Sequence, residues 1–249
     1  MKNVFLETGN VAAFREALGV LEDTDRGQPG LGVVWGRAGR GKTLCAREYA
    51  VRTGAIYVRV MEDWTPRAML ASLCRSLNGT EPRSAEACKQ SICEQLEKRG
   101  AEKRSQTILV DEADRLDMHL VEHYRDIHDL TGAPVVLVGE EVLFAMLNAR
   151  RRLWSRVTQT VEFGSITAED AMLFGFKAAE LKLEPAAAQR LVARAGGDFR
   201  LVWIDVHDLE QMARASGTKA VDVKMVHALP ARRTGPSAPP AGPGVRNGR

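Results

Sequence analysis

The sequence has little of several features, and each scarcity narrows the class of protein. No apolar run approaches the length of a membrane span, about eighteen residues or more, so no membrane partner is expected. The first nine residues, Met1-Lys-Asn-Val-Phe-Leu-Glu-Thr-Gly, lack the apolar core of a signal peptide, which predicts a cytoplasmic protein. The chain has 4 cysteines and no Cys-x-x-Cys pair, so we expect free thiols rather than disulfides or a zinc site.

The chain also lacks a large excess of charge of either sign. Lys and Arg number 35 against 32 Asp and Glu, a formal net charge of +3. Residues 231–249 contain four arginines and no acid, so the rest of the chain carries a net charge of −1. This balance excludes a uniformly basic nucleic-acid binder and leaves room for a local basic patch.

Strand and helix patterns alternate over the first two thirds of the chain. Apolar runs predict five strands, at residues 31–35, 55–60, 107–111, 134–139 and 158–163. Amphipathic patterns predict helices at residues 10–24, 42–53, 65–77, 84–99, 117–130 and 141–150. The alternation predicts an α/β fold with a parallel sheet covered by helices on both faces.

The pattern changes after Gly164. Four further segments are predicted to be helical with no strand between them, at residues 167–180, 184–195, 199–215 and 221–229. We therefore expect an α/β domain over residues 1–164 and a small all-α domain over residues 165–229. Residues 230–249 are rich in proline and glycine, which predicts a disordered tail.

The strongest motif lies between the first predicted strand and the next helix. Gly36-Arg-Ala-Gly-Arg-Gly-Lys-Thr43 matches the phosphate-loop pattern GxxxxGK[ST]. In such a loop, backbone N–H groups at a helix N-terminus surround phosphate oxygens. Lys42 is expected to reach the β- and γ-phosphates, and the Thr43 hydroxyl to bind Mg²⁺. The predicted nucleotide-contacting residues of this loop are Gly36, Arg37, Ala38, Gly39, Arg40, Gly41, Lys42, Thr43 and Leu44.

A second motif ends the predicted strand at residues 107–111. Asp111 is expected to hold Mg²⁺ through water, and Glu112 to orient or deprotonate the attacking water. Residues 111–114 also spell the Asp-Glu-Ala-Asp motif of helicases, but the chain is too short for the second RecA-like domain that a helicase needs. The two motifs together favour an ATPase.

Two arginines narrow the family. Ser155-Arg156 precedes the fifth predicted strand, and Gly196-Gly-Asp-Phe-Arg200 opens a helix of the C-terminal segment. With these residues the chain resembles AAA+ ATPases. The resemblance implies a P-loop NTPase core with a five-stranded parallel sheet and a helical lid, with ATP and Mg²⁺ bound between them.

The same resemblance assigns roles to the arginines. It implies that Arg156, with Arg152 as the alternative, reaches the nucleotide of a neighbouring subunit as an arginine finger, so a homo-oligomer is expected. It implies that Arg200 contacts the γ-phosphate of its own subunit as sensor 2. Each guanidinium would stabilise charge on the transferring phosphoryl group. The alternatives are a solvated basic surface at residues 150–156 and a salt bridge within the lid at Arg200.

One position departs from the family pattern. The fourth predicted strand ends Val138-Gly139-Glu140, where AAA+ proteins usually place Asn, Thr or Ser as sensor 1. Glu140 either hydrogen-bonds the attacking water or leaves that role unfilled. The departure bears on the rate of hydrolysis more than on nucleotide binding.

A narrower resemblance covers about residues 5–229. The order of the motifs, with Trp64-Thr-Pro-Arg67 at a helix start and Leu-x-Ser-Arg before the fifth strand, is similar to the transposition regulators. That group includes the B protein of Mu-type phages, TnsC and the TniB proteins. The resemblance implies an ATP-dependent helical filament on duplex DNA without sequence preference, which delivers target DNA to a transposase in the cytoplasm of a bacterium or phage-infected host.

Two clusters are candidate DNA contacts, because phosphate groups bind basic side chains, hydroxyls and helix N-termini. One is Trp64, Thr65 and Arg67 at a predicted helix start, and the other is Lys98, Arg99, Lys103 and Arg104. Ordinary solvated surface charge is the alternative for both. Two other functions share the ATP motifs: a helicase loader or initiator, and a nucleotide-gated signalling switch that binds a protein partner and no DNA.

Overall fold

In the computed structural model, which describes residues 1–23 and 30–231, one parallel sheet has the strand order β2-β3-β4-β1-β5. Its strands are β1 (Leu31–Trp35), β2 (Ile56–Arg59), β3 (Ile108–Asp111), β4 (Val135–Val138) and β5 (Val157–Glu162). The five predicted strands and the α/β class are confirmed. The predicted disordered tail lies outside the described residues from residue 232 onward.

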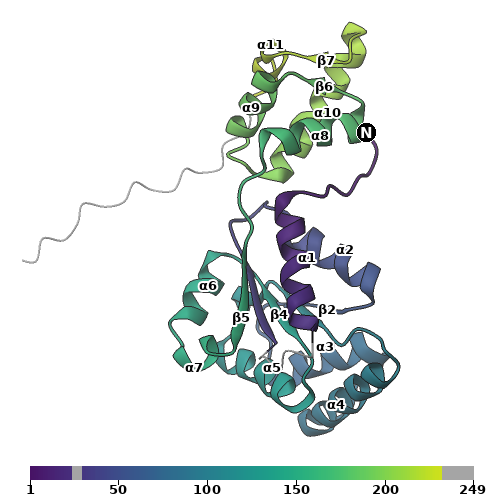
Figure 1. Ribbon diagram of the computed structural model, residues 1–249, viewed down its shortest axis with the longest axis vertical. Helices are drawn as coiled ribbons and strands as arrows, with labels where there is room; N and C mark the ends of the chain where they lie inside the picture. Colours follow the sequence, from purple (N-terminus) through teal and green to yellow (C-terminus); the bar gives the residue numbers. More distant parts are fainter. Residues whose placement is uncertain (24–29, 232–249) are drawn as a thin grey trace, which may run out of the picture.

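Helices cover both faces of this sheet (Figure 1). They are α1 (Gly9–Glu22), α2 (Lys42–Thr53), α3 (Pro66–Asn78), α4 (Ala85–Ala101), α5 (Met118–Thr131), α6 (Glu141–Asn148) and the short α7 (Arg151–Trp154). A 3-10 turn, η2 (Ala113–Arg115), follows β3. Thr65 caps α3 by accepting a hydrogen bond from the Ala68 N–H, and Pro66 is the first helical residue.

The central strands are apolar along their whole length because helices pack against both of their faces. All four residues of β3 are buried, as are all four of β4. Ile108 and Val110 belong to the cluster packed by α3, α4 and α5, whereas Leu109 belongs to the cluster packed by α1 and α2. Successive side chains point to opposite faces, so a strand buried on both sides must be apolar throughout.

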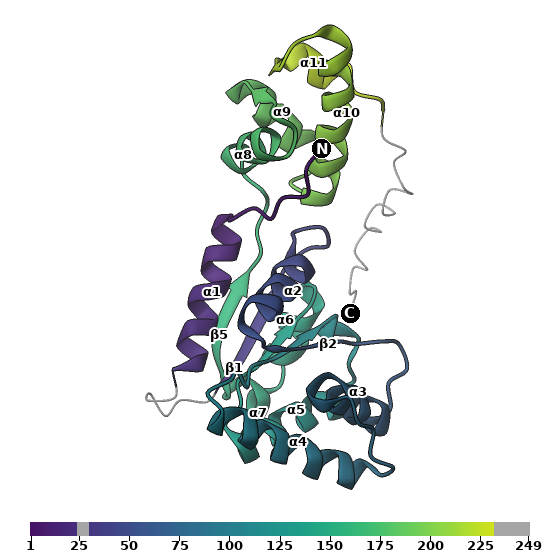
Figure 2. The same cartoon turned by 90° about the vertical axis from the view of Figure 1, so that its right-hand side faces the viewer.

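The C-terminal helices form a separate layer above the carboxyl ends of the strands (Figures 1 and 2). They are α8 (Ala168–Ala179), α9 (Pro185–Arg194), α10 (Phe199–Ser216) and α11 (Val223–His227). They enclose their own apolar cluster, which includes Phe174, Leu191 and Val206. The helical lid is therefore confirmed. It also carries two parallel strands of two residues each, β6 (Lys182–Leu183) and β7 (Ala220–Val221), which the sequence did not predict.

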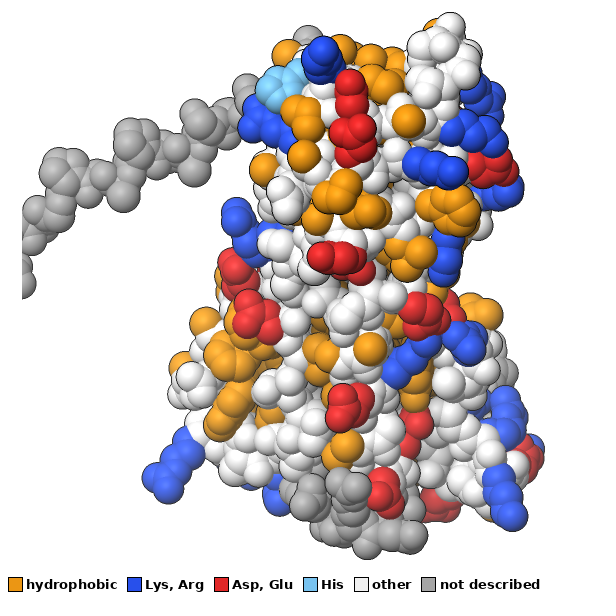
Figure 3. All heavy atoms as spheres, turned by 45° about the horizontal axis from the view of Figure 1, so that its top comes forward, with side chains coloured by type: hydrophobic (Ala, Val, Ile, Leu, Met, Phe, Trp, Pro, Cys, Tyr) orange, Lys and Arg blue, Asp and Glu red, His pale blue; other side chains and the backbone are white. Residues whose placement is uncertain are grey.

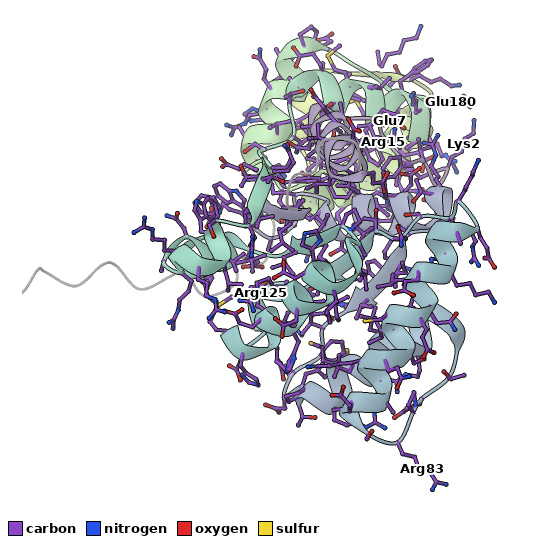
Figure 4. All side chains as sticks on the ribbon, turned by 60° about the horizontal axis from the view of Figure 1, so that its bottom comes forward. Lys2, Glu7, Arg15, Arg83, Arg125 and Glu180 are labelled. Carbon is purple, nitrogen blue, oxygen red and sulfur yellow. The ribbon has the colours of Figure 1, made fainter. Side chains whose placement is uncertain are left out.

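The N-terminal segment belongs with the lid by its packing, although the predicted division assigns it to the α/β domain. Residues 1–6 run from α1 up to the lid (Figure 2). Leu6 is buried in the apolar cluster of the lid, and the Lys2 N–H donates to the Ala178 carbonyl at 2.6 Å. The Lys2 ammonium lies 3.2 Å from Glu180, and Glu7 lies beside Arg15 of α1 (Figure 4). The lid is thus held to the core by two chain segments, residues 1–8 and residues 163–167.

Within residues 1–23 and 30–231, none of the helices combines the length and the apolar character that crossing a membrane requires.

Candidate functional site

A cavity of about 570 Å³ lies at the carboxyl edge of the sheet, between the core and the lid. Its size falls within the range of small-molecule sites, and its position is where open α/β sheets bind ligands. The loops that follow β1, β3 and β4 and the first turns of α10 supply its walls. They contribute Ala38, Gly39, Arg40, Gly41, Lys42, Thr43, Leu44, Arg47, Asp111, Glu112, Asp114, Gly139, Glu140, Phe199, Arg200, Trp203 and Ile204.

The phosphate loop connects β1 to α2 as predicted. Gly41 is the N-cap of α2 and has φ +94°, a left-handed conformation that favours glycine. The first N–H groups of a helix have no partners inside it, and Lys42, Thr43 and Leu44 at the start of α2 line the cavity. The loop therefore offers the backbone donors and the positive helix end that a phosphate group binds.

Lys42 lies inside this loop. Its ammonium donates to the carbonyls of Gly36 at 2.6 Å and Arg37 at 2.9 Å. Burial lowers the pKa of Lys42, while the carboxylates of Glu140, Asp114, Asp111 and Glu112 act in the opposite direction. These four acids around the cavity favour a divalent cation beside any bound phosphate.

The two predicted Mg²⁺ residues lie together. The Thr43 hydroxyl donates to Asp111 Oδ1 at 3.2 Å, and the Tyr57 hydroxyl of β2 donates to Asp111 Oδ2 at 2.6 Å. Burial raises the pKa of Tyr57 and the Asp111 hydrogen bond adds to the shift, so the hydroxyl stays a donor. Hydroxyl and carboxylate oxygens are the ligands that Mg²⁺ prefers, so Thr43 and Asp111 fit the ion.

Sequence reasoning missed Tyr57, because its role depends on the pairing of β2 with β3. Tyr57 pairs with Leu109, two residues before Asp111, and its long side chain spans the difference. Alternation along β2 alone shows only that Tyr57 and Arg59 share one face.

Glu112 comes directly after β3 in a left-handed conformation, with φ +60°. Such a conformation in a residue other than glycine costs of order 1 kcal/mol or more and is common at functional sites. Its carboxylate lies 3.2 Å from the Arg59 guanidinium and 3.4 Å from that of Arg115. In this arrangement two arginines hold the carboxylate of the predicted base.

Glu140 lies on the cavity wall after β4, at the predicted position. Its backbone N–H donates to Asp114 Oδ1 at 3.0 Å. Asp114 thereby connects the turn after β3 to the turn after β4. Asp114 was expected only to complete a resemblance to the helicase motif, and its hydrogen bond to Glu140 is a structural reason for an acid at this position.

The lid brings Arg200 to the same cavity. Asp198 caps α10 by accepting hydrogen bonds from the N–H groups of Arg200 at 2.8 Å and Leu201 at 3.3 Å. This cap fixes the first turn of α10, from which Arg200 faces the phosphate loop across the cavity. Trp203 and Ile204, one turn later, line the cavity and are about half exposed; sequence reasoning did not include them in the site.

The other two arginines of the predicted ATP machinery do not line this cavity. Arg152 lies in α7, and Arg156 precedes β5 at the amino edge of the sheet. Arg156 is exposed and its guanidinium lies 3.8 Å from Asp129 of α5. Neither side chain is among those that meet the phosphate loop of its own chain.

The candidate DNA residues fall at opposite edges of the sheet. Trp64, Thr65 and Arg67 follow β2 at the carboxyl edge, whereas residues 98–104 precede β3 at the amino edge. Acidic and basic side chains are interspersed over the face shown in Figure 3. The two clusters therefore do not form one continuous basic surface.

Several of these side chains have structural partners. Arg67 donates to the carbonyls of Pro82 at 2.6 Å and Arg83 at 3.2 Å, and Trp64 packs against the larger core cluster. Arg99 is only 7% exposed and donates to the carbonyls of Ser105 at 2.7 Å and Gly54, so its guanidinium is not presented to a ligand. Lys98, Lys103 and Arg104 are exposed.

A second, smaller cavity of about 40 Å³ adjoins the first behind the phosphate loop. The N-terminal segment, the core and the lid all contribute to its mostly apolar wall. Among its lining residues are Val4, Phe5, Leu6, Leu44, Cys45, Phe163, Ile166 and Phe199. The sequence carried no signal for this wall, because its members are far apart along the chain.

Comparison with known proteins agrees with this architecture. Residues 25–147 match the family model described as AAA domain. No curated protein matches the chain. Among solved structures, the chain is similar to ORC2 of Aeropyrum pernix in its ADPNP-ADP complexes, with 14% identity and a TM-score of 0.65 over 92% of this chain and 69% of that chain.

Two further solved structures have the same fold. The RuvB Holliday junction branch migration motor of Thermotoga maritima is 20% identical, with a TM-score of 0.58 over 90% of this chain and 68% of that chain. Cdc6p of Pyrobaculum aerophilum is 18% identical, with a TM-score of 0.63 over 88% of this chain and 66% of that chain. The chain therefore has the AAA+ P-loop NTPase fold, and the family match supports an AAA+ ATPase.

Proposed function

We propose that this chain is a Mg²⁺-dependent ATPase that acts as a AAA+ oligomer. The observation that carries the proposal is the convergence of the phosphate loop, Asp111, Glu112 and Arg200 on one cavity. Lys42 and the N–H groups of the loop would bind the β- and γ-phosphates, and Thr43 with Asp111 would hold Mg²⁺. Glu112, once released from Arg59 and Arg115, would take the proton of the attacking water.

The smaller cavity is the place we assign to the nucleotide base. Its apolar wall adjoins Gly41 and Leu44, so a base there would continue from phosphates bound in the loop. The N-terminal segment, the core and the lid all line this cavity, so a base bound there would contact all three.

Hydrolysis would need a second subunit. Arg152 and Arg156 lie away from the cavity of their own chain, whereas the cavity is open to a neighbouring molecule. A guanidinium supplied by that neighbour would stabilise charge on the transferring phosphoryl group. The lone chain would then bind ATP and hydrolyse it slowly.

The test is the rate of phosphate release per chain as protein concentration rises. For the wild type we expect the rate to increase with assembly. Arg156→Ala should bind ATP normally and lose the increase, with a rate in the assembled state lower by about 10³-fold, the lower end of the effect of an arginine finger. Arg83→Ala, which alters an exposed arginine that points away from the body (Figure 4), is the control. An unchanged rate in assembled Arg156→Ala would exclude Arg156 as the finger.

We further propose that the oligomer forms on duplex DNA without sequence preference and delivers that DNA to a transposase. The order of motifs along the chain supports this proposal. The small net charge of +3 also supports it, because it fits weak DNA binding by each subunit, multiplied over many subunits. Trp64 and Thr65 at the carboxyl edge, and Lys98, Lys103 and Arg104 at the amino edge, are the proposed contacts. The DNA-bound form is proposed to be a helical filament.

A labelled duplex titrated with the protein at several salt concentrations tests this proposal. We expect binding with ATP, little binding with ADP or without nucleotide, and affinity that falls steeply as salt increases. Adding the transposase should then stimulate hydrolysis. Absence of DNA binding in every nucleotide state would favour a nucleotide-gated switch for a protein partner instead.

An initiator or helicase loader is the second candidate, because ORC2 and Cdc6p share the fold. Such a protein would also bind DNA and ATP. The two candidates separate by partner: a loader retains a replicative helicase on DNA in the presence of ATP, whereas a transposition regulator retains a transposase.

A further inference from the structure

The phosphate loop is hydrogen-bonded directly to the lid through its tip. The Gly39 carbonyl accepts from the Phe199 N–H at 2.9 Å, and Arg40 Nη2 donates to the Gly196 carbonyl at 3.1 Å. Residues 39 and 40 lie between the fixed glycines of the motif. Backbone and side chain of the loop thus contact the turn that connects α9 to α10.

Arg40 occupies the joint between three segments. Its guanidinium lies against Gly197 of the lid turn and near Ser165 of the core–lid connection, because a Cβ atom added to Gly197 would overlap both. Gly197 has φ +70°, so glycine serves the turn as well as the close approach. The Ile166 N–H donates to the Gly197 carbonyl at 3.3 Å, which joins the connection to the same turn.

The contact is partly unsatisfied. Arg40 Nη1 is buried and has no hydrogen-bond partner among the residues that the structure describes. A buried charged donor without a partner has a cost in free energy, which the other contacts of Arg40 with the lid turn must offset.

Arg200 depends on this turn for its position. It follows Phe199, whose N–H is bonded to the loop, and its own N–H is bonded to Asp198 of the turn. We propose that Arg40 is a positioning residue that fixes the lid turn against the phosphate loop and so places Arg200 over the terminal phosphate. The proposal rests on the proposed function, since it requires a bound nucleoside triphosphate.

The consequence is a discrimination between nucleotides. ADP lacks the γ-phosphate that Arg200 would contact, so fixing Arg200 helps ATP binding and has little effect on ADP binding. We expect Arg40→Ala to weaken binding of a non-hydrolysable ATP analogue about tenfold, as for the loss of a hydrogen bond to a charged group, and ADP binding less than about twofold. Arg40→Lys, which keeps a donor for Gly196, should restore part of the difference.

A double-mutant cycle gives the sharpest test, because Arg40 and Arg200 act on the ligand by a shared route. Dissociation constants for the ATP analogue and for ADP are measured by calorimetry with the full chain. In the Arg200→Ala background, Arg40→Ala should leave the ratio of the two constants unchanged, whereas independent effects would multiply. Arg190→Ala, at an exposed arginine of α9, is the control for a general loss of lid charge.

The outcomes separate this proposal from the proposed function. If wild-type protein binds neither nucleotide, both are wrong. If it binds both and Arg40→Ala weakens ATP analogue and ADP equally, Arg40 is a direct ligand of the shared part of the nucleotide and the positioning role is excluded. If Arg40→Ala alters neither constant, the positioning role of Arg40 is excluded while the ATPase assignment stands.

Discussion

The two edges of the sheet use polar side chains in opposite ways. At the amino edge, several buried polar groups bond to the backbone, although Thr107 bonds to the side chain of Glu22. His128 accepts from the Gly30 N–H at 3.0 Å through Nε2, so its Nδ1 carries the proton that it shares with the Ala133 carbonyl at 2.8 Å. Arg99 joins two backbone carbonyls, of Gly54 and Ser105. These contacts close loops, and they leave no polar group that could exchange its partner for a ligand.

At the carboxyl edge the polar groups bond mainly to one another. Thr43 and Tyr57 share Asp111, and Glu112 lies between Arg59 and Arg115. Asp111 is buried, whereas Glu112 and its two arginines are partly exposed, and all of these groups lie where a metal ion or a phosphate could replace their present partners. From this difference we expect polar residues at the amino edge to contribute mainly to stability, and those at the carboxyl edge to contribute more to function than to stability.

Among the variants that compare the two edges, Glu112→Gln gives the largest expected effect. The amide keeps the shape of the side chain and cannot take a proton, so hydrolysis should fall by at least about 100-fold while ATP still binds. Phosphate release in single turnover measures the first effect, and ATP retention on the assembled protein measures the second.

The same variant also tests the stability side of the comparison. Glu112 loses only partly exposed ion pairs, so the free energy of unfolding should change by less than about 1 kcal/mol. Wild-type phosphate release by Glu112→Gln would show that another residue is the base. A large loss of stability would show that this edge also holds the fold together.

Arg99→Met should give the next largest effect, on stability rather than function. The substitution leaves two carbonyls without their donor, which we expect to lower the free energy of unfolding by about 2 kcal/mol. Urea denaturation measures it, with Arg83→Met as the control because Arg83 is exposed. The dissociation constant for ATP should stay within twofold of wild type. A change in ATP binding without a change in stability would reverse the roles that we assign to the two edges.

Much of this fold could be predicted because its signals are local. Each of these signals lies within a few consecutive residues. They are the apolar strands that alternate with capped helices, the glycines of the phosphate loop, and the Asp-Glu pair after β3. Their convergence also followed, since parallel strands all end at one edge. The predicted strand and helix ranges therefore agree with the structure closely.

The rest depends on contacts between distant residues. The Tyr57 hydroxyl of β2 bonds to Asp111 of the neighbouring strand β3, and Arg40 bonds to Gly196 of the lid. Leu6 packs into the apolar cluster of the lid. No spacing in the sequence encodes these pairs. Arg99 is a residue to which the sequence assigns a surface role that the fold does not support. Its place in a basic cluster made it a candidate DNA contact, and only the fold shows that it is buried against backbone carbonyls.

A pair of identical substitutions makes the finest comparison of the two edges. Tyr57→Phe removes the hydroxyl that orients Asp111, and outer partners of metal ligands typically contribute about tenfold in affinity, so Mg²⁺ should bind about tenfold more weakly in the presence of ATP. Tyr49→Phe removes a hydroxyl that donates to Glu22 at 3.0 Å, near the amino edge, and should leave Mg²⁺ affinity unchanged while lowering stability by about 1 kcal/mol. Mg²⁺ titration of ATP binding and urea denaturation of both variants give the four values. If neither substitution changes Mg²⁺ affinity, the Tyr57 hydroxyl does not orient Asp111, and Tyr57 contributes only through the packing of its ring, which Tyr57→Phe preserves.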